Sequence, residues 1–221
     1  NEYDKVGLIG EEGNGKSILL KTIVDRKEVE KYCVVYGDIS KNNEVIAYLP
    51  QSLDEKYFEL SPMDYLYKKV DISLVDYNSL YKYMSEFNLP DNILSDNVKM
   101  KNLSGGERIK FILLVELLKE PTILLFDEPS NDLDYDSLDW LEIFMKNLEI
   151  PFIFVSHDTS LLSNVANRII HLEQVRRRTE AKHTISNNSY SDYVKKRENF
   201  INTQTSRANN CLLYTSPSPR D

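Results

Sequence analysis

A glycine-rich segment near the start of the chain limits its fold more than any other feature. Residues 10–17 read Gly-Glu-Glu-Gly-Asn-Gly-Lys-Ser, follow the apolar run 6–9 and precede the helix-like run 18–23. A strand, a glycine loop and a helix in this order form a phosphate-binding loop, in which backbone N–H groups at the helix start hold a triphosphate. The segment therefore predicts an α/β protein with a nucleotide site.

The residue types in this loop suit a triphosphate that carries Mg²⁺. Glycines leave space for phosphate oxygens, a lysine can approach the β and γ phosphates, and a hydroxyl is a ligand that Mg²⁺ prefers. The alternative is a glycine-rich turn without function. The Lys-Ser pair at 16–17 and the flanking strand-like and helix-like runs argue against that alternative. We expect the nucleotide to be bound by Gly10, Gly13, Asn14, Gly15, Lys16 and Ser17, with Ser17 as a metal ligand.

A pair of carboxylates is the second candidate part of the site. Residues 122–126 are apolar enough for a buried parallel strand, and Asp127 and Glu128 follow directly. Ligands of open α/β sheets bind at the carboxyl ends of the strands. We therefore expect Asp127 to hold the hydration shell of Mg²⁺ and Glu128 to orient or deprotonate an attacking water.

A third motif, Leu-Ser-Gly-Gly-Glu at residues 103–107, has the spacing of a helix start. Ser104 and Glu107 are three residues apart, as in a capping box, and precede an amphipathic helix predicted over roughly 107–119. The glycines between them, Gly105 and Gly106, leave the N-terminus of that helix open to an anion.

The order of these motifs resembles an ATP-binding cassette (ABC) ATPase over about residues 6–172. The further segments that carry the resemblance are Gln51, Phe-Asp-Glu-Pro at 126–129, Ser-Asn-Asp-Leu-Asp at 130–134 and Val-Ser-His-Asp at 155–158. The resemblance implies a P-loop NTPase cassette with a mostly parallel core sheet and a small helical subdomain at about 53–103. It also implies ATP and Mg²⁺ as cofactors and ATP hydrolysis as the activity.

The resemblance assigns roles to two further residues. Gln51 would sense Mg²⁺ and the γ-phosphate, as a metal ligand beside Ser17 and Asp127, and His157 would be the switch histidine that contacts the γ-phosphate. His157 follows the strand-like run 152–155, which we expect to lie beside the strand that ends at Asp127. We expect the histidines without such a context, His171 and His183, to be surface or packing residues.

The resemblance also implies a second cassette as a partner. In this family the Leu-Ser-Gly-Gly-Glu motif of one cassette, called the signature, lies over the γ-phosphate that the glycine loop of another cassette holds. Asp134 would close the loop that faces the partner cassette. The signature residues here are Ser104, Gly105, Gly106 and Glu107. One cassette by itself would therefore bind ATP but hydrolyse it poorly.

Two kinds of cassette protein are possible assignments for this chain. Glu107 stands where transporter cassettes usually carry glutamine, residues 130–134 approximate Thr-Asn-His-Leu-Asp, and residues 188–197 resemble the close of an ABC-F cassette. These features favour a soluble twin-cassette protein of the ABC-F family, which acts on the ribosome as a translation factor or in antibiotic resistance by ribosome protection. The alternative is the nucleotide-binding subunit of an ABC membrane transporter. Ser130 and Asp132 depart from the family pattern.

The two ends of the chain carry separate expectations. We expect the cassette to cover residues 1–197 with its start missing, because only nine residues precede Gly10 and leave no room for the aromatic residue that usually stacks on adenine in this family. Residues 198–210 would begin a charged linker between cassettes. Residues 211–221 resemble a translated sequencing-library adapter, so we leave them out of the fold prediction; a disordered Ser/Pro-rich tail is the alternative.

Composition limits the cellular setting. Without the last eleven residues Cys33 is the only cysteine, no segment has the form of a signal peptide, and no apolar run approaches the roughly 20 residues that span a bilayer. The net charge of −8 argues weakly against a general nucleic-acid coat. Basic runs at 176–178 and 195–197 are more typical of solvated faces. We expect a soluble, cytoplasmic protein.

Overall fold

One six-stranded sheet forms the centre of the molecule. The computed structural model describes residues 4–71, 73, 75–173 and 182–215, with side chains up to residue 206. The strand order is β2-β3-β4-β1-β5-β6, and every neighbouring pair is parallel except β5 and β6. The strands are β1 (Lys5–Gly10), β2 (Ile46–Leu49), β3 (Ile123–Asp127), β4 (Phe152–Val155), β5 (Arg168–Glu173) and β6 (Lys182–Ser186). The predicted α/β class with a mostly parallel sheet is confirmed.

The register of the strands brings their carboxyl ends to one edge. Asp127 at the end of β3 lies opposite Val155 of β4, and Leu49 of β2 lies opposite Phe126. The expectation that residues 152–155 form a strand beside the Asp127 strand is therefore confirmed. Because the loops after β1, β2, β3 and β4 leave the same edge, segments far apart in the sequence meet there.

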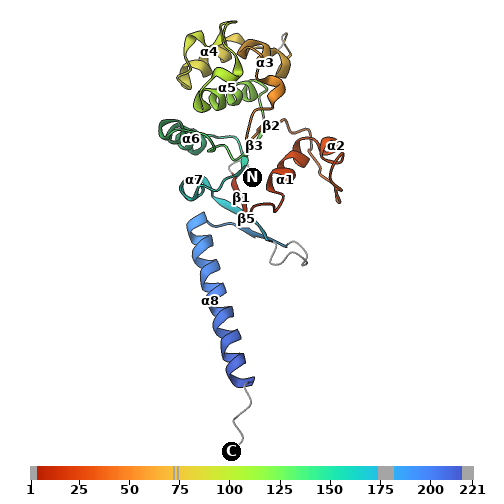
Figure 1. Ribbon diagram of the computed structural model, residues 1–221, viewed down its shortest axis with the longest axis vertical. Helices are drawn as coiled ribbons and strands as arrows, with labels where there is room; N and C mark the ends of the chain where they lie inside the picture. Colours follow the sequence, from red (N-terminus) through yellow and green to blue (C-terminus); the bar gives the residue numbers. More distant parts are fainter. Residues whose placement is uncertain (1–3, 72, 74, 174–181, 216–221) are drawn as a thin grey trace, which may run out of the picture.

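Helices cover both faces of the sheet (Figure 1). On one face α1 (Lys16–Val24) packs with a small core that includes Leu8, Leu20 and Leu125. The opposite face carries α6 (Tyr135–Asn147) and α7 (Thr159–Val165), whose buried side chains join Phe126, Phe152 and Phe154 in the larger core. Burial on both faces explains why these strands read as continuous apolar runs in the sequence rather than as alternating ones.

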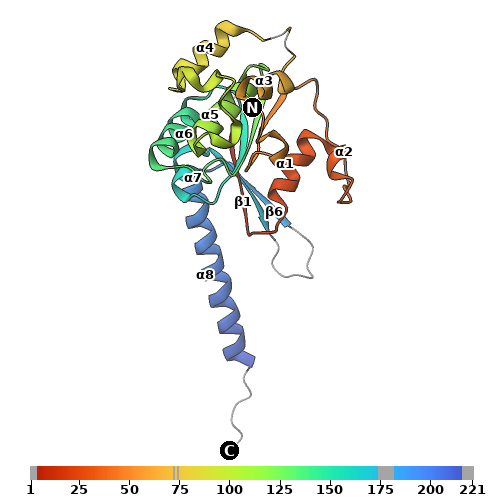
Figure 2. The same cartoon turned by 45° about the horizontal axis from the view of Figure 1, so that its top comes forward.

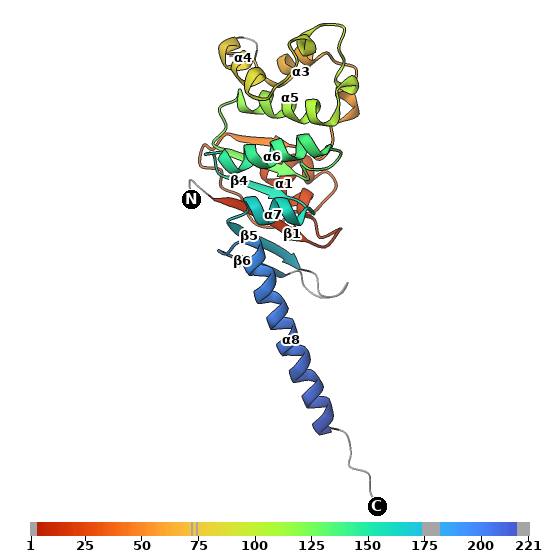
Figure 3. The same ribbon diagram turned by 90° about the vertical axis from the view of Figure 1, so that its left-hand side faces the viewer.

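A group of helices lies beyond the end of the sheet (Figure 3). It contains α3 (Pro62–Lys69), α4 (Tyr77–Glu86) and α5 (Gly105–Leu117), joined by short 3₁₀ turns. The predicted capping box is present, because the Ser104 hydroxyl accepts the Glu107 N–H while the Glu107 carboxylate accepts the Ser104 N–H. The helix begins at residue 105 and ends at 117, two residues earlier at each end than the sequence predicted. It begins earlier because Ser104 is the N-cap, so the first helical residue follows it directly.

The last helix, α8 (Tyr190–Thr215), projects away from the body of the molecule (Figures 1 and 2). Its first turns are anchored by Tyr193, which is buried against the large core, and it continues without a break through residues 197 and 198. The expected boundary between cassette and linker, after residue 197, therefore does not coincide with a helix end or a break in the backbone. The basic run 176–178 and residues 216–221 lie outside the described part of the chain, and no helix within that part is both long and apolar enough to cross a bilayer.

Candidate nucleotide-binding site

A cleft of about 540 Å³ opens at the carboxyl edge of the sheet, beside the glycine loop. It brings together residues from four separate segments of the chain. Five of the lining residues are predicted site residues other than glycine: Lys16, Ser17, Gln51, Glu128 and His157. The other lining residues are Glu12, Gly13, Gly15, Ile18 and Asn131. Asn131 and Glu12 were not among the predicted site residues.

The glycine loop adopts a conformation that its sequence explains. Gly13 and Gly15 have φ angles of 80° and 78°, in the left-handed region where a Cβ atom is unfavourable. Gly15 is the N-cap of α1 and supplies no side chain to cap the helix. The backbone N–H groups at the start of α1 therefore point into the cleft without a side-chain acceptor in front of them, as an anion site requires.

The Lys16 ammonium is held inside the loop. Its side chain is buried, and Nζ donates to the carbonyl oxygens of Gly10 and Glu11 at 2.9 and 3.1 Å. These two acceptors are neutral, so a phosphate oxygen can replace one of them with a stronger, charge-assisted hydrogen bond. The loop thus keeps a positive charge beside the helix N-terminus.

Asp127 is buried and receives hydrogen bonds from two hydroxyls, one of which belongs to Ser17 in the lining of the cleft. Ser17 Oγ donates to Oδ1 at 2.8 Å, and the Tyr48 hydroxyl donates to Oδ2 at 2.9 Å. Burial and the neighbouring Asp127 carboxylate raise the pKa of Tyr48 far above its usual range, so the phenol remains a donor. Tyr48 was not among the predicted site residues, although its position three residues before the predicted metal ligand Gln51 is a usable signal in the sequence.

The donor atoms around Asp127 suit a hard cation. A carboxylate, the Ser17 hydroxyl and the Gln51 amide oxygen are the oxygen ligands that Mg²⁺ prefers. Among the described residues no group of three or more His, Cys, Asp or Glu side chains is arranged to hold a metal ion. The residues thus fit an ion that is bound by a few protein oxygens together with water and phosphate, the usual mode for Mg²⁺.

Glu128 is positioned by His157 and by an unusual backbone. Its φ angle is 50°, its side chain is buried, and its Oε2 accepts the His157 N–H at 3.2 Å while Oε1 lies 3.1 Å from His157 Nε2. A left-handed conformation at a residue other than glycine costs free energy and is concentrated at functional sites. Here it turns the carboxylate into the cleft rather than along the strand.

The predicted signature lies outside this cleft. The start of α5 packs on the start of α6, where a Cβ atom on Gly105 would lie 2.3 Å from the Asp132 carbonyl oxygen and one on Gly106 would lie 2.0 Å from Ser137 Oγ. Asp134 accepts the Ser137 N–H at 2.9 Å and caps α6. The signature and the loop that contains Asp134 therefore form one contiguous unit that does not line the cleft beside the glycine loop.

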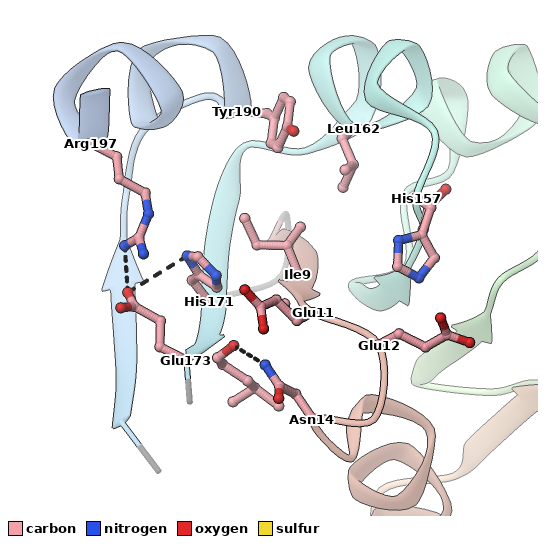
Figure 4. A pocket seen from close by; sticks show the side chains of 13 residues that line it. Ile9, Glu11, Glu12, Asn14, His157, Leu162, His171, Glu173, Tyr190 and Arg197 are labelled. Carbon is pink, nitrogen blue, oxygen red and sulfur yellow. Dashed lines mark hydrogen bonds and ion pairs between the residues drawn. The ribbon is translucent and has the colours of Figure 1, made fainter. Parts of the chain in front are cut away.

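A larger cavity, of about 730 Å³, lies on the other side of the glycine loop, toward α8 (Figure 4). Asn14 Nδ2 donates to the Leu172 carbonyl at 3.0 Å, which ties the loop to the end of β5. The next residue, Glu173, pairs with Arg197 of α8 at 2.5 Å. His171 is half-buried and its Nδ1 lies 2.6 Å from the Tyr193 hydroxyl, so it is a packing residue as expected.

Comparison with known proteins places this geometry in a family. Residues 1–131 match the family described as ABC transporter. ATP-binding protein Uup of Buchnera aphidicola subsp. Schizaphis graminum is 32% identical over 206 residues, which are 90% of this chain and 32% of that protein. ABC transporter F family member 5 of Arabidopsis thaliana is 26% identical over 91% of this chain and 34% of its own length. Elongation factor 3 of Pneumocystis carinii is 31% identical over 76% of this chain and 15% of its own length.

Solved structures agree on the fold. A metal-chelate type ABC transporter in an inward-facing conformation has a TM-score of 0.62 at 18% identity, covering 84% of this chain and 88% of that one. Archaeal ABCE1, in a model of ribosome-bound Pelota and ABCE1, also has a TM-score of 0.62, at 22% identity, covering 84% of this chain and 30% of that one. The chain spans about a third or less of the length of the curated relatives. It belongs to the ABC transporter family as an ATP-binding cassette ATPase, with ABC-F proteins among its relatives.

Proposed function

We propose that the cleft beside the glycine loop binds ATP with Mg²⁺ through the residues that the sequence predicted. The observation that carries this proposal is the meeting of Lys16, Ser17, Gln51, Glu128 and His157 in one cleft. The N–H groups at the start of α1 and the Lys16 ammonium would hold the phosphates. Ser17, Asp127 and Gln51 would hold Mg²⁺, which when bound neutralises developing charge on the phosphates.

Hydrolysis would depend on Glu128. Its carboxylate faces the cleft and can orient an attacking water and accept its proton. His157, 3.1 Å from that carboxylate, would keep it in place and contact the γ-phosphate. This arrangement places the base and its positioning partner on the loops after β3 and β4, two neighbouring strands of the sheet.

Full activity would need a second cassette. The signature residues Ser104 to Glu107 and the loop at Asp134 lie away from the cleft of their own chain. In the proposed cycle they contact the ATP and the facing loop of a partner cassette, ATP closes the pair, and hydrolysis opens it. The rate per chain should then rise with protein concentration, because pairing is bimolecular.

The proposed site of action is the ribosome, in the cytoplasm, as a translation factor or as a ribosome-protection protein in antibiotic resistance. Support comes from similarity to proteins named ABC transporter F family member 5 and elongation factor 3. The fold alone does not discriminate between a transporter subunit and a ribosome-acting protein, because a transporter and ribosome-bound ABCE1 have the same TM-score against this chain. Sequence similarity over most of this chain therefore carries the proposal.

Co-sedimentation with ribosomes tests this function directly. A Glu128→Gln variant should bind ATP without turning it over and should sediment with ribosomes in the presence of Mg²⁺ and ATP, but not with ADP. The result would instead favour a transporter subunit if the variant bound ATP, did not associate with ribosomes and was recovered in a complex with membrane-spanning subunits. An absence of ATP binding would refute the cassette site itself.

A further inference from the structure

Glu116 is a buried carboxylate that the proposed mechanism does not use. It lies near the end of α5, and its side chain is 6% exposed. Its Oε1 accepts a hydrogen bond from Lys119 Nζ at 2.6 Å, and its Oε2 accepts the backbone N–H of Tyr48 in β2 at 3.4 Å. A glutamate is rarely buried to this extent unless its oxygens are paired, so these two contacts account for its position.

The contact with Tyr48 covers an edge of the sheet. In a strand, the backbone groups of successive residues face opposite neighbours. The carbonyl oxygen of Val45 accepts the N–H groups of Thr122 and Ile123, so it faces β3. Tyr48 is three residues farther along, so its N–H faces away from β3, and β2 is the end strand of the described sheet. Glu116 therefore supplies an acceptor to an N–H group that no described strand can pair with.

Tyr48 connects this contact to the candidate metal site. Its N–H is bound to Glu116, while its hydroxyl donates to Asp127 Oδ2 at 2.9 Å. Asp127 also accepts the Ser17 hydroxyl at 2.8 Å. Two successive hydrogen bonds therefore lead from α5, through one residue of β2, to a carboxylate that we propose as a ligand of Mg²⁺.

The surroundings of Glu116 hold it in place. The helix runs unbroken from residue 105 to 117 and lies beside β2 (Figure 1). Residues 111–117, Glu116 among them, are all buried. Tyr65 of α3 is close enough that the Glu116 carboxylate adds to the effect of burial in raising the pKa of its phenol. Because the packing of α5 fixes this carboxylate, its position can determine the position of Tyr48.

We propose that Glu116 is a positioning residue of the nucleotide site, whose carboxylate holds Tyr48 so that the tyrosine hydroxyl keeps Asp127 in the orientation that binds Mg²⁺. The proposal rests on the ATP and Mg²⁺ site proposed above and adds the contact that supports this site from α5. Glu116 does not line the cleft, so it acts through Tyr48. Since α5 begins directly after Ser104, the same contact joins the signature helix to the metal ligands of its own chain.

A titration of ATP binding against Mg²⁺ tests the proposal on the full 221-residue chain. Glu116→Met keeps a long side chain but removes the acceptor for the Tyr48 N–H. The Mg²⁺ concentration for half-maximal ATP binding should rise about 3- to 10-fold. This rise is smaller than the roughly 10- to 100-fold effect of removing a direct partner of a metal ligand, because Glu116 is one residue farther away.

Two further measurements separate the metal from the phosphates and the charge from the hydrogen bond. ATP affinity without Mg²⁺, measured by calorimetry in EDTA, should stay within about 2-fold in Glu116→Met, because the glycine loop and Lys16 hold the phosphates. Glu116→Gln, whose amide oxygen can still accept the Tyr48 N–H, should have the Mg²⁺ requirement of the unchanged chain.

A double-mutant cycle separates positioning from a general loss of stability. In a Tyr48→Phe background, Glu116→Met should change the Mg²⁺ requirement by less than about 2-fold, because the hydroxyl through which it acts is absent. Leu117→Ala is the matched control, since Leu117 is the next residue of α5 and is also buried. Its truncation should lower the unfolding temperature without changing the Mg²⁺ requirement.

The proposal is overturned if Glu116→Met leaves the Mg²⁺ requirement unchanged, if its effect is undiminished in the Tyr48→Phe background, or if Leu117→Ala raises the requirement equally. Glu116→Ala is the second variant, with the same expected shift, should the methionine variant not fold. Failure of both variants to fold would make Glu116 a structural residue only and would also overturn the proposal. Failure of the unchanged chain to bind ATP would instead refute the proposed ATP site, so the two failures are distinguishable.

Discussion

Ser17 Oγ donates to Asp127 Oδ1 at 2.8 Å, across a sequence separation of 110 residues. This single contact joins the end of the glycine loop to the end of β3. Both side chains offer oxygen to a hard cation, and the parallel pairing of β3 with β2 and β4 fixes the carboxylate at that position. The hydrogen bond thus links two motifs, each of which the sequence suggests separately.

Replacement of Lys16 by alanine should abolish nucleotide binding. The ammonium is the cation held within the loop, and a triphosphate loses its charge-assisted hydrogen bond without it. We expect ATP affinity to fall by at least about 100-fold, measured by calorimetry. Lys21→Ala, on an exposed position of the same helix, should have no effect. Equal affinity in Lys16→Ala would mean that this loop is not the phosphate cradle.

Replacement of Glu128 by glutamine should separate binding from turnover. Glutamine keeps the shape and can still accept the His157 N–H, but it cannot take a proton from water. We expect ATP affinity within about 2-fold and hydrolysis reduced by about 100-fold or more. The measurements are calorimetry and phosphate release, with exposed Glu149→Gln as control. Loss of ATP binding would contradict the assigned role.

Removal of the Tyr48 hydroxyl should weaken the metal end of the site. Tyr48→Phe leaves Oδ2 of the buried Asp127 without its tyrosine donor, at a cost of about 1–3 kcal/mol in the free energy of unfolding. Thermal unfolding would measure that loss, and a titration of ATP binding against Mg²⁺ should require more metal. Tyr36→Phe, at a residue 91% exposed, is the control. An unchanged unfolding temperature would argue against a structural role for this hydroxyl.

A methyl group on Gly105 should disturb the contact between α5 and α6. The added Cβ would lie 2.3 Å from the backbone oxygen of Asp132, a separation that the neighbouring loop must relieve by moving. We expect Gly105→Ala to lower the free energy of unfolding by about 1–3 kcal/mol, measured by urea denaturation. ATP affinity of the single cassette should persist, because this contact lies outside the cleft. Asn102→Ala, at an exposed position, should cause neither change.

The pair of Glu173 and Arg197 should make the anchor of α8 sensitive to acid. The hydrogen bond from Arg197 lowers the pKa of Glu173, against the opposing effect of burial. A lowered carboxyl pKa contributes stability above its unfolded value of about 4.3 and loses it as the pH falls through the lower folded value.

Arg197→Met should therefore reduce the free energy of unfolding by about 1 kcal/mol at pH 7, and the difference from the unchanged chain should shrink below about pH 4. Chemical denaturation at a series of pH values measures this difference. Lys195→Met, on the exposed side of the same helix, is the control. A difference that stays constant down to pH 3 would show that the methionine acts through packing alone.

Much of the fold was predictable because its signals are local. Apolar runs of strand length, a glycine loop before a helix and a capping box at Ser104 depend on neighbouring residues only. The structure confirms that the apolar run that begins at residue 122 contains a strand, observed at 123–127, and that this strand pairs in parallel with the predicted strand at 152–155. The continuation of α8 across residues 197 and 198 was not predicted, because a change of function along a helix leaves no mark on its backbone hydrogen bonds.

The sequence by itself determined the class of the fold and the residue types of the candidate phosphate site, since motif spacing and apolar runs of strand length follow from short-range chemistry. Only the tertiary structure decided which side chains lie beside those motifs. Tyr48 reaches Asp127 because β2 pairs with β3, and His183 lines a cavity together with the glycine loop because β6 lies antiparallel to β5. Such contacts depend on strand register, which is set by packing of the whole sheet and not by either segment alone.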